Sequence, residues 1–210
     1  MTRDQSFGQS WEPTLVDRFG VALSARAVRR NARWQGLRTA DFGCGFHATL
    51  SRSMLPEVAH TTLVDVALAP DLHANSKVTA IEGSLSDVLP QIPDESLDLL
   101  LCLSVLEHLT DPLGALGHFH RALVPGGTAL LNVPTWRGKW FLELAAFRLG
   151  VSPAEEMDDH KRYYDPRDLW PMLVEVGFKP SAIRCRRHKF GLNTFAVCSK
   201  SAPTATAEDA

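Results

Sequence analysis

The chain has 210 residues, of which 45% are hydrophobic and 22% are charged, a balance typical of one globular domain with a full core. Its formal net charge of −2 predicts no general attraction to nucleic acid or to an anionic membrane. No apolar run approaches the roughly 20 residues of a membrane span, and the polar N-terminus does not resemble a secretory signal.

An N-terminal helical region is expected within residues 1–36, with its helix from about Leu15 to Trp34. Four arginines follow an i, i+3, i+4, i+7 pattern on one face of this helix: Arg26, Arg29, Arg30 and Arg33. The pattern is typical of a solvated face. The alternative is a docking patch for an anionic substrate or a lipid surface.

Strand and helix patterns alternate from residue 37 to about residue 200, and residues 201–210 are expected to form a disordered tail. Five strands are expected at 37–42, 60–66, 77–83, 96–104 and 128–134. Helices are expected at 112–123 and 165–178, followed by two strands, 181–187 and 193–199, that are joined by a turn. We therefore predict an α/β fold with a doubly wound, mostly parallel, seven-stranded sheet that ends in an antiparallel hairpin. Such a sheet binds ligands at the carboxyl ends of its strands.

A glycine loop follows the first expected strand, in the stretch "ADFGCGFHATL" of residues 40–50. Glycines permit the close backbone approach that a nucleotide-type ligand needs. Gly43 to Ala48 satisfies the G-x-G-x-x-A dinucleotide pattern, and Asp65 follows Gly45 by about 20 residues, so a nicotinamide-dependent oxidoreductase is one hypothesis. Asp41 argues against it, because a carboxylate there would repel a pyrophosphate and attract an ammonium group.

The order of motifs over residues 37–135 resembles a known family, the class I S-adenosylmethionine-dependent methyltransferases of small-molecule type. The motifs are the D-x-G-C-G loop, an acid after the second strand, "LEHL" followed by "DP", and "PGG" followed by "LLNVP". Within that family the chain is most similar to the ubiquinone-biosynthesis group (methyltransferase type 11/12). The resemblance implies S-adenosyl-L-methionine as the cofactor. It also implies methyl transfer to an oxygen or nitrogen of a small or lipid-linked metabolite. No nucleic-acid module is visible, so we expect no nucleic-acid substrate.

Carried over by position, the resemblance implies a cofactor site at the carboxyl ends of the first four strands. Its members are Asp41, Gly43, Cys44, Gly45, Asp65, Val66, Ser84, Leu85, Cys102, Leu103 and Ser104. Asp41 and the glycine backbone would face the methionine part, and Asp65 would accept hydrogen bonds from both ribose hydroxyls. The amide of Leu85 would face the adenine ring.

Two positions depart from the family pattern. His47 stands in place of the third glycine, and Ser84 in place of the acid that reads the adenine amine. A hydroxyl can still accept from an amine, with a loss of about 1 kcal/mol. His47 puts a side chain where the helix N-terminus meets the ligand. These departures support an alternative, a catalytically inactive scaffold or partner protein that keeps the fold.

The expected chemistry needs alignment of the acceptor and a base for its proton. We expect His160 to be that base or a substrate contact, and His108 to be the second candidate, because histidine suits this task near neutral pH. The alternatives are a loop histidine paired with an acid for His160 and a loop brace for His108. Metal-dependent relatives carry an acid three residues before Glu107, where this chain has Ser104, so we expect no metal. The four scattered cysteines form no CxxC pair, which predicts no zinc site and a cytoplasmic location.

Residues 135–165 are expected to form a substrate or lid insertion. Its segment 136–149 is apolar on nearly every side, which predicts a lid over the substrate, a homodimer interface or a membrane-surface contact. The residues expected to contact the acceptor substrate are Trp140, Arg162, Tyr163 and Tyr164.

Overall fold

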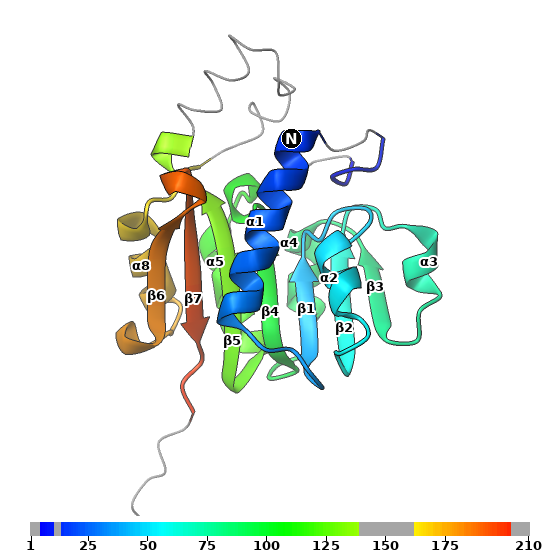
Figure 1. The fold of residues 1–210 in the computed structure, drawn as a ribbon. Helices are drawn as coiled ribbons and strands as arrows, with labels where there is room; N and C mark the ends of the chain where they lie inside the picture. Colours follow the sequence, from blue (N-terminus) through cyan, green and yellow to red (C-terminus); the bar gives the residue numbers. More distant parts are fainter. Residues whose placement is uncertain (1–4, 11–13, 139–161, 203–210) are drawn as a thin grey trace, which may run out of the picture.

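A computed structural model describes residues 5–10, 14–138 and 162–202 (Figure 1). The strands are β1 (Arg38–Phe42), β2 (His60–Asp65), β3 (Val78–Glu82), β4 (Leu97–Leu103), β5 (Leu123–Pro134), β6 (Ile183–His188) and β7 (Asn193–Ser199). The α-helices are α1 (Leu15–Asn31), α2 (Thr49–Met54), α3 (Pro70–His73), α4 (Leu85–Val88), α5 (Pro112–Ala122) and α8 (Pro166–Glu175).

Within these residues, the strands form one seven-stranded sheet in the order β3-β2-β1-β4-β5-β7-β6. The first five strands run parallel, and β7 is antiparallel to both β5 and β6. The predicted fold class is therefore confirmed. The division into an N-terminal region, a main domain and an insertion stays a prediction.

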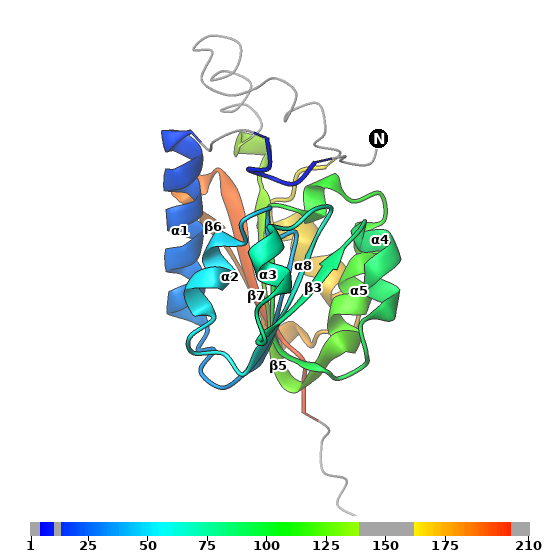
Figure 2. The ribbon, with the colours of Figure 1, turned by 90° about the vertical axis from the view of Figure 1, so that its right-hand side faces the viewer.

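Helices cover both faces of the sheet: α1 and α2 lie on one face, and α4, α5 and α8 on the other (Figure 2). Strand β4 contributes to both layers, as its apolar sequence predicts. Leu99 and Leu101 pack into one cluster with Val28 of α1, whereas Leu100 packs into the other cluster with Phe119 of α5. The centre of the sheet is buried from both sides as a result.

Helix α1 begins at a capping box in which Thr14 and Asp17 exchange side-chain and backbone hydrogen bonds. It ends at Asn31, three residues earlier than predicted, because Ala32 already has extended backbone angles. Arg26, Arg29 and Arg30 are exposed, as in a solvated helix face, and the exposed Arg33 lies beyond the end of the helix.

Strand β5 begins earlier than predicted. The turn residues Pro125–Gly127 lie inside it as a bulge, because Leu97 pairs with Leu123 while Leu99 already pairs with Thr128. Gly126 takes a positive φ of 83° there, which suits glycine.

Candidate functional site

The glycine loop leaves β1 at the carboxyl edge of the sheet. Gly43 and Gly45 both have positive φ angles, 75° and 76°, and the amide of Gly43 donates to the carbonyl of Val64 (2.7 Å). A Cβ atom on Gly43 would lie 2.2 Å from Cγ2 of Val105, which follows β4. The sequence needs glycine at position 43 for both reasons, backbone angle and space.

Asp65, the last residue of β2, lies beside this loop as the sequence predicts. Its Oδ2 atom accepts from the amide of Gly45 (2.7 Å), and its Oδ1 atom accepts from the amide of Val66 (2.8 Å). The hydroxyl of Ser6 also donates to Oδ1 (2.5 Å), from a segment of chain that lies above the carboxyl ends of β1 and β2 (Figures 1 and 2).

Asp41 lies beneath the loop rather than on its open side. It is 4% exposed, and its Oδ2 atom accepts from the hydroxyl of Ser51 (2.6 Å). Burial raises the pKa of Asp41 to about 7; the Ser51 hydrogen bond lowers it and the charge of Asp65 raises it further. Cys44, the loop residue between the two glycines, has a pKa raised by burial and by these two carboxylates, so its thiol stays protonated.

His47 does not fill the loop. Its side chain is exposed, and its ring contacts the ring of Phe46 at 5.0 Å between centroids. It lines a shallow hollow with Arg52 and Asp71. Ala48 then takes the left-handed conformation (φ 44°) in front of α2. The departure from the third glycine is therefore accommodated by an outward side chain.

Ser84 follows β3 and is the N-cap of α4, with Leu85 as the first helical residue. The hydroxyl of Ser84 donates to Oδ2 of Asp87 (2.7 Å) and accepts from the amide of the same residue (3.4 Å). Asp87 is exposed. Position 84 therefore lacks the acid of the family pattern, but the Ser84 hydroxyl that replaces it is hydrogen-bonded to the carboxylate of Asp87.

Cys102, Leu103 and Ser104, at the end of β4, were all expected to line the cofactor, but they differ in burial. Cys102 is completely buried and packs in the core, so its side chain does not line an open site. Leu103 is half-buried, whereas Ser104 is exposed with φ 61°. Asn132 of β5 holds Ser104 by two hydrogen bonds, from Nδ2 to Oγ (3.1 Å) and from the Ser104 amide to the Asn132 carbonyl (2.7 Å).

Four titratable side chains lie on the β4–β5 side of the same edge: Glu107, His108, Tyr164 and Lys189. Glu107 is 1% exposed in the short helix η2 (Leu106–His108), with His108 half-buried beside it. Burial raises the pKa of the Tyr164 hydroxyl; the charge and hydrogen bond of Arg162 lower it, and the Glu107 carboxylate adds a smaller increase. Burial also lowers the pKa of Lys189 to about 8, opposed by Glu107.

Tyr164 and Lys189 come from segments far along the chain. The amide of Tyr164 donates to Pro134 at the end of β5, and its carbonyl accepts from Thr194 Oγ1 (2.7 Å). Lys189 lies in the turn η4 (Lys189–Gly191) between β6 and β7, with φ 48°. Its Nζ would be 3.7 Å from a Cβ atom on Gly20 of α1.

The remaining predicted acceptor contacts are only partly described. The ring of Tyr163 contacts that of Trp136 at 5.4 Å, and Arg162 is exposed. His160 and Trp140 lie outside the described residues, as do residues 139–149 of the apolar segment. Among the described residues, no three His, Cys, Asp or Glu side chains gather so that they could hold a metal ion.

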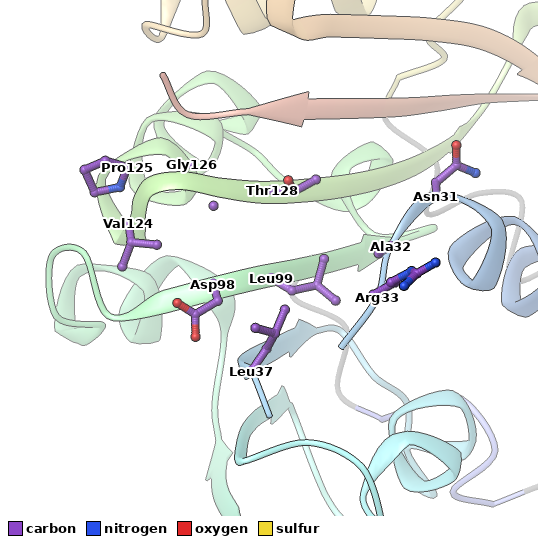
Figure 3. Close-up of a pocket in the computed structure, with 11 residues that line it drawn as sticks. Asn31, Ala32, Arg33, Leu37, Asp98, Leu99, Val124, Pro125, Gly126 and Thr128 are labelled. Carbon is purple, nitrogen blue, oxygen red and sulfur yellow. The ribbon is translucent and has the colours of Figure 1, made fainter. Parts of the chain in front are cut away.

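A separate hollow opens at the opposite, amino-terminal edge of the sheet (Figure 3). It lies between Arg33 in the connection after α1, Asp98 in β4 and the bulge of β5. The carboxylate of Asp98 accepts from Arg38 Nη2 (2.9 Å) and from the amide of Arg38 (2.8 Å), so its oxygens are used within the chain. The hollow is remote from the glycine loop.

Comparison with known proteins settles the family. A family described as a methyltransferase domain matches residues 16–182, which include α1 except Leu15 and all five parallel strands of the sheet. The chain belongs to this methyltransferase family.

Two curated relatives of this chain are ubiquinone biosynthesis O-methyltransferases. The protein from Aeromonas salmonicida (strain A449) is 29% identical over 152 residues, which cover 68% of this chain and 63% of that protein. The protein from Xylella fastidiosa (strain 9a5c) is 30% identical over 167 residues, 71% of this chain and 64% of that protein. The chain therefore spans less than two thirds of the length of these relatives.

Solved structures share the fold of this chain. A SAM-dependent methyltransferase from Archaeoglobus fulgidus has a TM-score of 0.63 at 14% identity, covering 85% of this chain and 94% of its own. The [4+2]-cyclase SpnF has a TM-score of 0.64 at 12% identity, covering 94% and 87%. At these identities the likeness concerns the fold alone.

Proposed function

We propose that this methyltransferase binds S-adenosylmethionine at the edge formed by β1 to β4. The observation that carries the proposal is the carboxylate of Asp65, held by the amide of Gly45 directly beside a loop that only glycine can form. The ligand has an ammonium, a sulfonium and no phosphate, so it suits a loop with Asp41 beneath it and Asp65 beside it. A pyrophosphate would meet both carboxylates.

The chain's own residues divide the work of holding this cofactor. Asp65 accepts the ribose hydroxyls, Asp41 favours the cationic methionine end, and the Ser84–Asp87 pair faces the adenine amine in place of the usual acid. The bound cofactor supplies an electrophilic methyl carbon. Cys102 supports this edge from the core and makes no direct contact.

The acceptor site lies on the β4–β5 side, between Glu107, Tyr164 and Lys189. The acceptor is an oxygen or nitrogen of a small or lipid-linked metabolite, an assignment supported by relatives that are named O-methyltransferases. Arg162, Tyr163 and the outlying Trp140 remain predicted substrate contacts. His108 and His160 remain predicted bases. The homodimer and membrane-surface contacts of segment 136–149 also remain predictions. Among the described helices, none is long and apolar enough to cross a membrane.

The first experiment is calorimetric titration of the purified chain with S-adenosylmethionine, S-adenosylhomocysteine and NADH. We expect micromolar binding of the two sulfur compounds and none of NADH. Asp65→Asn should weaken S-adenosylhomocysteine binding at least tenfold, since a charged acceptor is lost (about 1.5–3 kcal/mol). The matched control is Asp94→Asn, an exposed acid paired with Arg121 on the far side of the fold. Binding of NADH alone would favour an oxidoreductase. Binding of none of the three compounds would favour a scaffold protein.

A fold match does not fix the reaction, as the similarity to a [4+2]-cyclase shows. Methyl transfer is therefore tested by S-adenosylhomocysteine release with a panel of small phenols, carboxylic acids and amines. The Lys189 amine is a further candidate base beside His108 and His160. We expect activity to rise as the pH passes through about 8 and to level off above it, because the amine accepts a proton only in its neutral form. Lys189→Met should remove this rise, whereas the exposed Lys179→Met should keep it. An unchanged pH profile in Lys189→Met contradicts a base role for Lys189.

A further inference from the structure

Residues 5–10 form a segment that we call the N-terminal strap. This strap hydrogen-bonds to the carboxylate of Asp65, the group that is proposed to bind the cofactor ribose. Ser6 is 2% exposed, and its hydroxyl donates to Asp65 Oδ1 (2.5 Å), with the carbonyl of Ala67 as a second acceptor in reach (2.6 Å). The same hydroxyl oxygen accepts from the amide of Ala67 (2.8 Å). The strap therefore contacts the end of β2 through the side chain of Ser6.

The strap also lies on the glycine loop. The carbonyl of Phe7 accepts from the amide of Phe46 (3.0 Å). A Cβ atom on Gly45 would lie 3.3 Å from that carbonyl oxygen, so glycine at position 45 leaves room for the strap. Two independent contacts thus place the strap where a nucleoside must enter.

The acceptor capacity of Asp65 decides what the ribose must displace. A carboxylate offers about four lone-pair positions. Three are used in this structure, by the amides of Gly45 and Val66 and by the hydroxyl of Ser6. A ribose diol brings two donors. The two amides are fixed by the backbone of the loop and of β2, so the hydroxyl of Ser6 is the partner that can leave.

We propose that Ser6 is a built-in competitor of the cofactor ribose, and that the N-terminal strap is released when the cofactor binds. The inference rests on the proposed cofactor. The competition lowers the affinity for the cofactor, because each binding event must break the Ser6–Asp65 hydrogen bond.

Calorimetric titration with S-adenosylhomocysteine tests the competition in the full chain. We expect Ser6→Ala to bind about three- to tenfold more tightly than the wild type, the range for loss of one competing hydrogen bond. Ser10→Ala is the matched control: it lies in the same strap, is exposed, and its hydroxyl donates to Gln5 (2.7 Å) rather than to Asp65. Its affinity should be unchanged.

Hydrogen exchange of the wild type gives a second readout that does not depend on a variant. Residues 5–10 should exchange faster when S-adenosylhomocysteine is added. Equal or weaker binding by Ser6→Ala, or slower exchange of the strap on binding, overturns the competition. If the wild type does not bind S-adenosylhomocysteine, the proposed function has failed and the competition with it; if it binds without these effects, only the competition has failed.

Discussion

Asp41 and Asp65 are two carboxylates at one edge with different surroundings. Asp65 accepts three hydrogen bonds, whereas Asp41 is buried and accepts one from Ser51. Burial therefore raises the pKa of Asp41 from 3.8 to about 7, and a large part of the free protein carries a proton there at neutral pH. A cation bound above the loop would favour the ionised form, so cofactor binding should release protons near pH 7.

Asp41→Asn should make the protein more stable at pH 8. The folded state of the wild type binds more protons than the unfolded chain between about pH 4 and 7, so its stability falls as the pH rises through this window. Asparagine keeps an acceptor for Ser51 without the buried charge. We expect a gain of about 1–3 kcal/mol in the free energy of unfolding at pH 8 and a flatter pH dependence, measured by urea unfolding at pH 4 and pH 8.

The exposed Asp94→Asn is the control, and it should leave the pH dependence as it is. A less stable Asp41→Asn at pH 8 would show that the ionised carboxylate contributes to folding rather than opposing it. The same variant should bind S-adenosylhomocysteine more weakly, an exchange of function for stability.

At the scale of elements, the conformation of the glycine loop depends on the connection after β4, which packs against it. Val105, in the connection after β4, occupies the space where a side chain on Gly43 would be. The loop after β1 and the connection after β4 are therefore one packed unit, which lies between the cofactor and acceptor sides of the edge.

Gly43→Ala should destabilise the fold by about 2–4 kcal/mol, because it combines a positive φ with a side-chain clash. Gly36→Ala is the matched control, since Gly36 also has a positive φ (70°) but no neighbouring atom within 4 Å of a new Cβ. It should lose about 1 kcal/mol. Chemical unfolding measures both, and Val105→Ala in the Gly43→Ala background should recover part of the loss. Equal losses at the two glycines would exclude the clash.

Most elements could be predicted because their signals are local. The apolar run of β4, the cap at Asp111 and the turn between β6 and β7 each lie within a few residues. The bulge at Pro125–Gly127 could not be predicted, because "PGG" fits a free turn equally well and the pairing with β4 decides between them.

The sequence predicted those site residues that occupy fixed positions in the family motifs: Asp41, Gly43, Gly45 and Asp65. Ser6 was not, because its partner is 59 residues away and segment 5–10 has no periodicity. Lys189 was not predicted, because nothing local distinguishes it within the basic stretch 184–189; burial against other elements gives it a lowered pKa. Ser51 has a weak signal, a hydroxyl one turn into the helix after the loop.

At the scale of the whole molecule, the two edges of the sheet have different roles. The carboxyl edge holds the glycine loop, the carboxylates and the strap, whereas the amino edge has the hollow of Figure 3 and its internal Arg38–Asp98 pair. Ligand effects should therefore be confined to one edge.

Hydrogen exchange with saturating S-adenosylhomocysteine should show slower exchange at residues 43–45 and 65–66 and no change at residues 124–127. The amides of Phe46 and Ala67 lose their hydrogen bonds to the released strap, so they should exchange faster. At a ligand concentration of about 100 times Kd, mass action also adds about 2.7 kcal/mol of stability. For a chain of this size that corresponds to a rise of about 5–10 °C in Tm. NADH is the control ligand. Equal protection at both edges would place a ligand in the hollow.

The antiparallel position of β7 has a consequence for synthesis of the chain. Strand β7 lies between β5 and β6, so until residues 193–199 have been made β6 has no partner strand and β5 is paired on one side only, with β4. A ribosome-bound chain that stops before residue 193 exposes the hydrogen-bonding edge of β5 in the middle of the sheet. A premature stop there, although it spares the entire cofactor edge, should yield an aggregating product rather than a weakened enzyme.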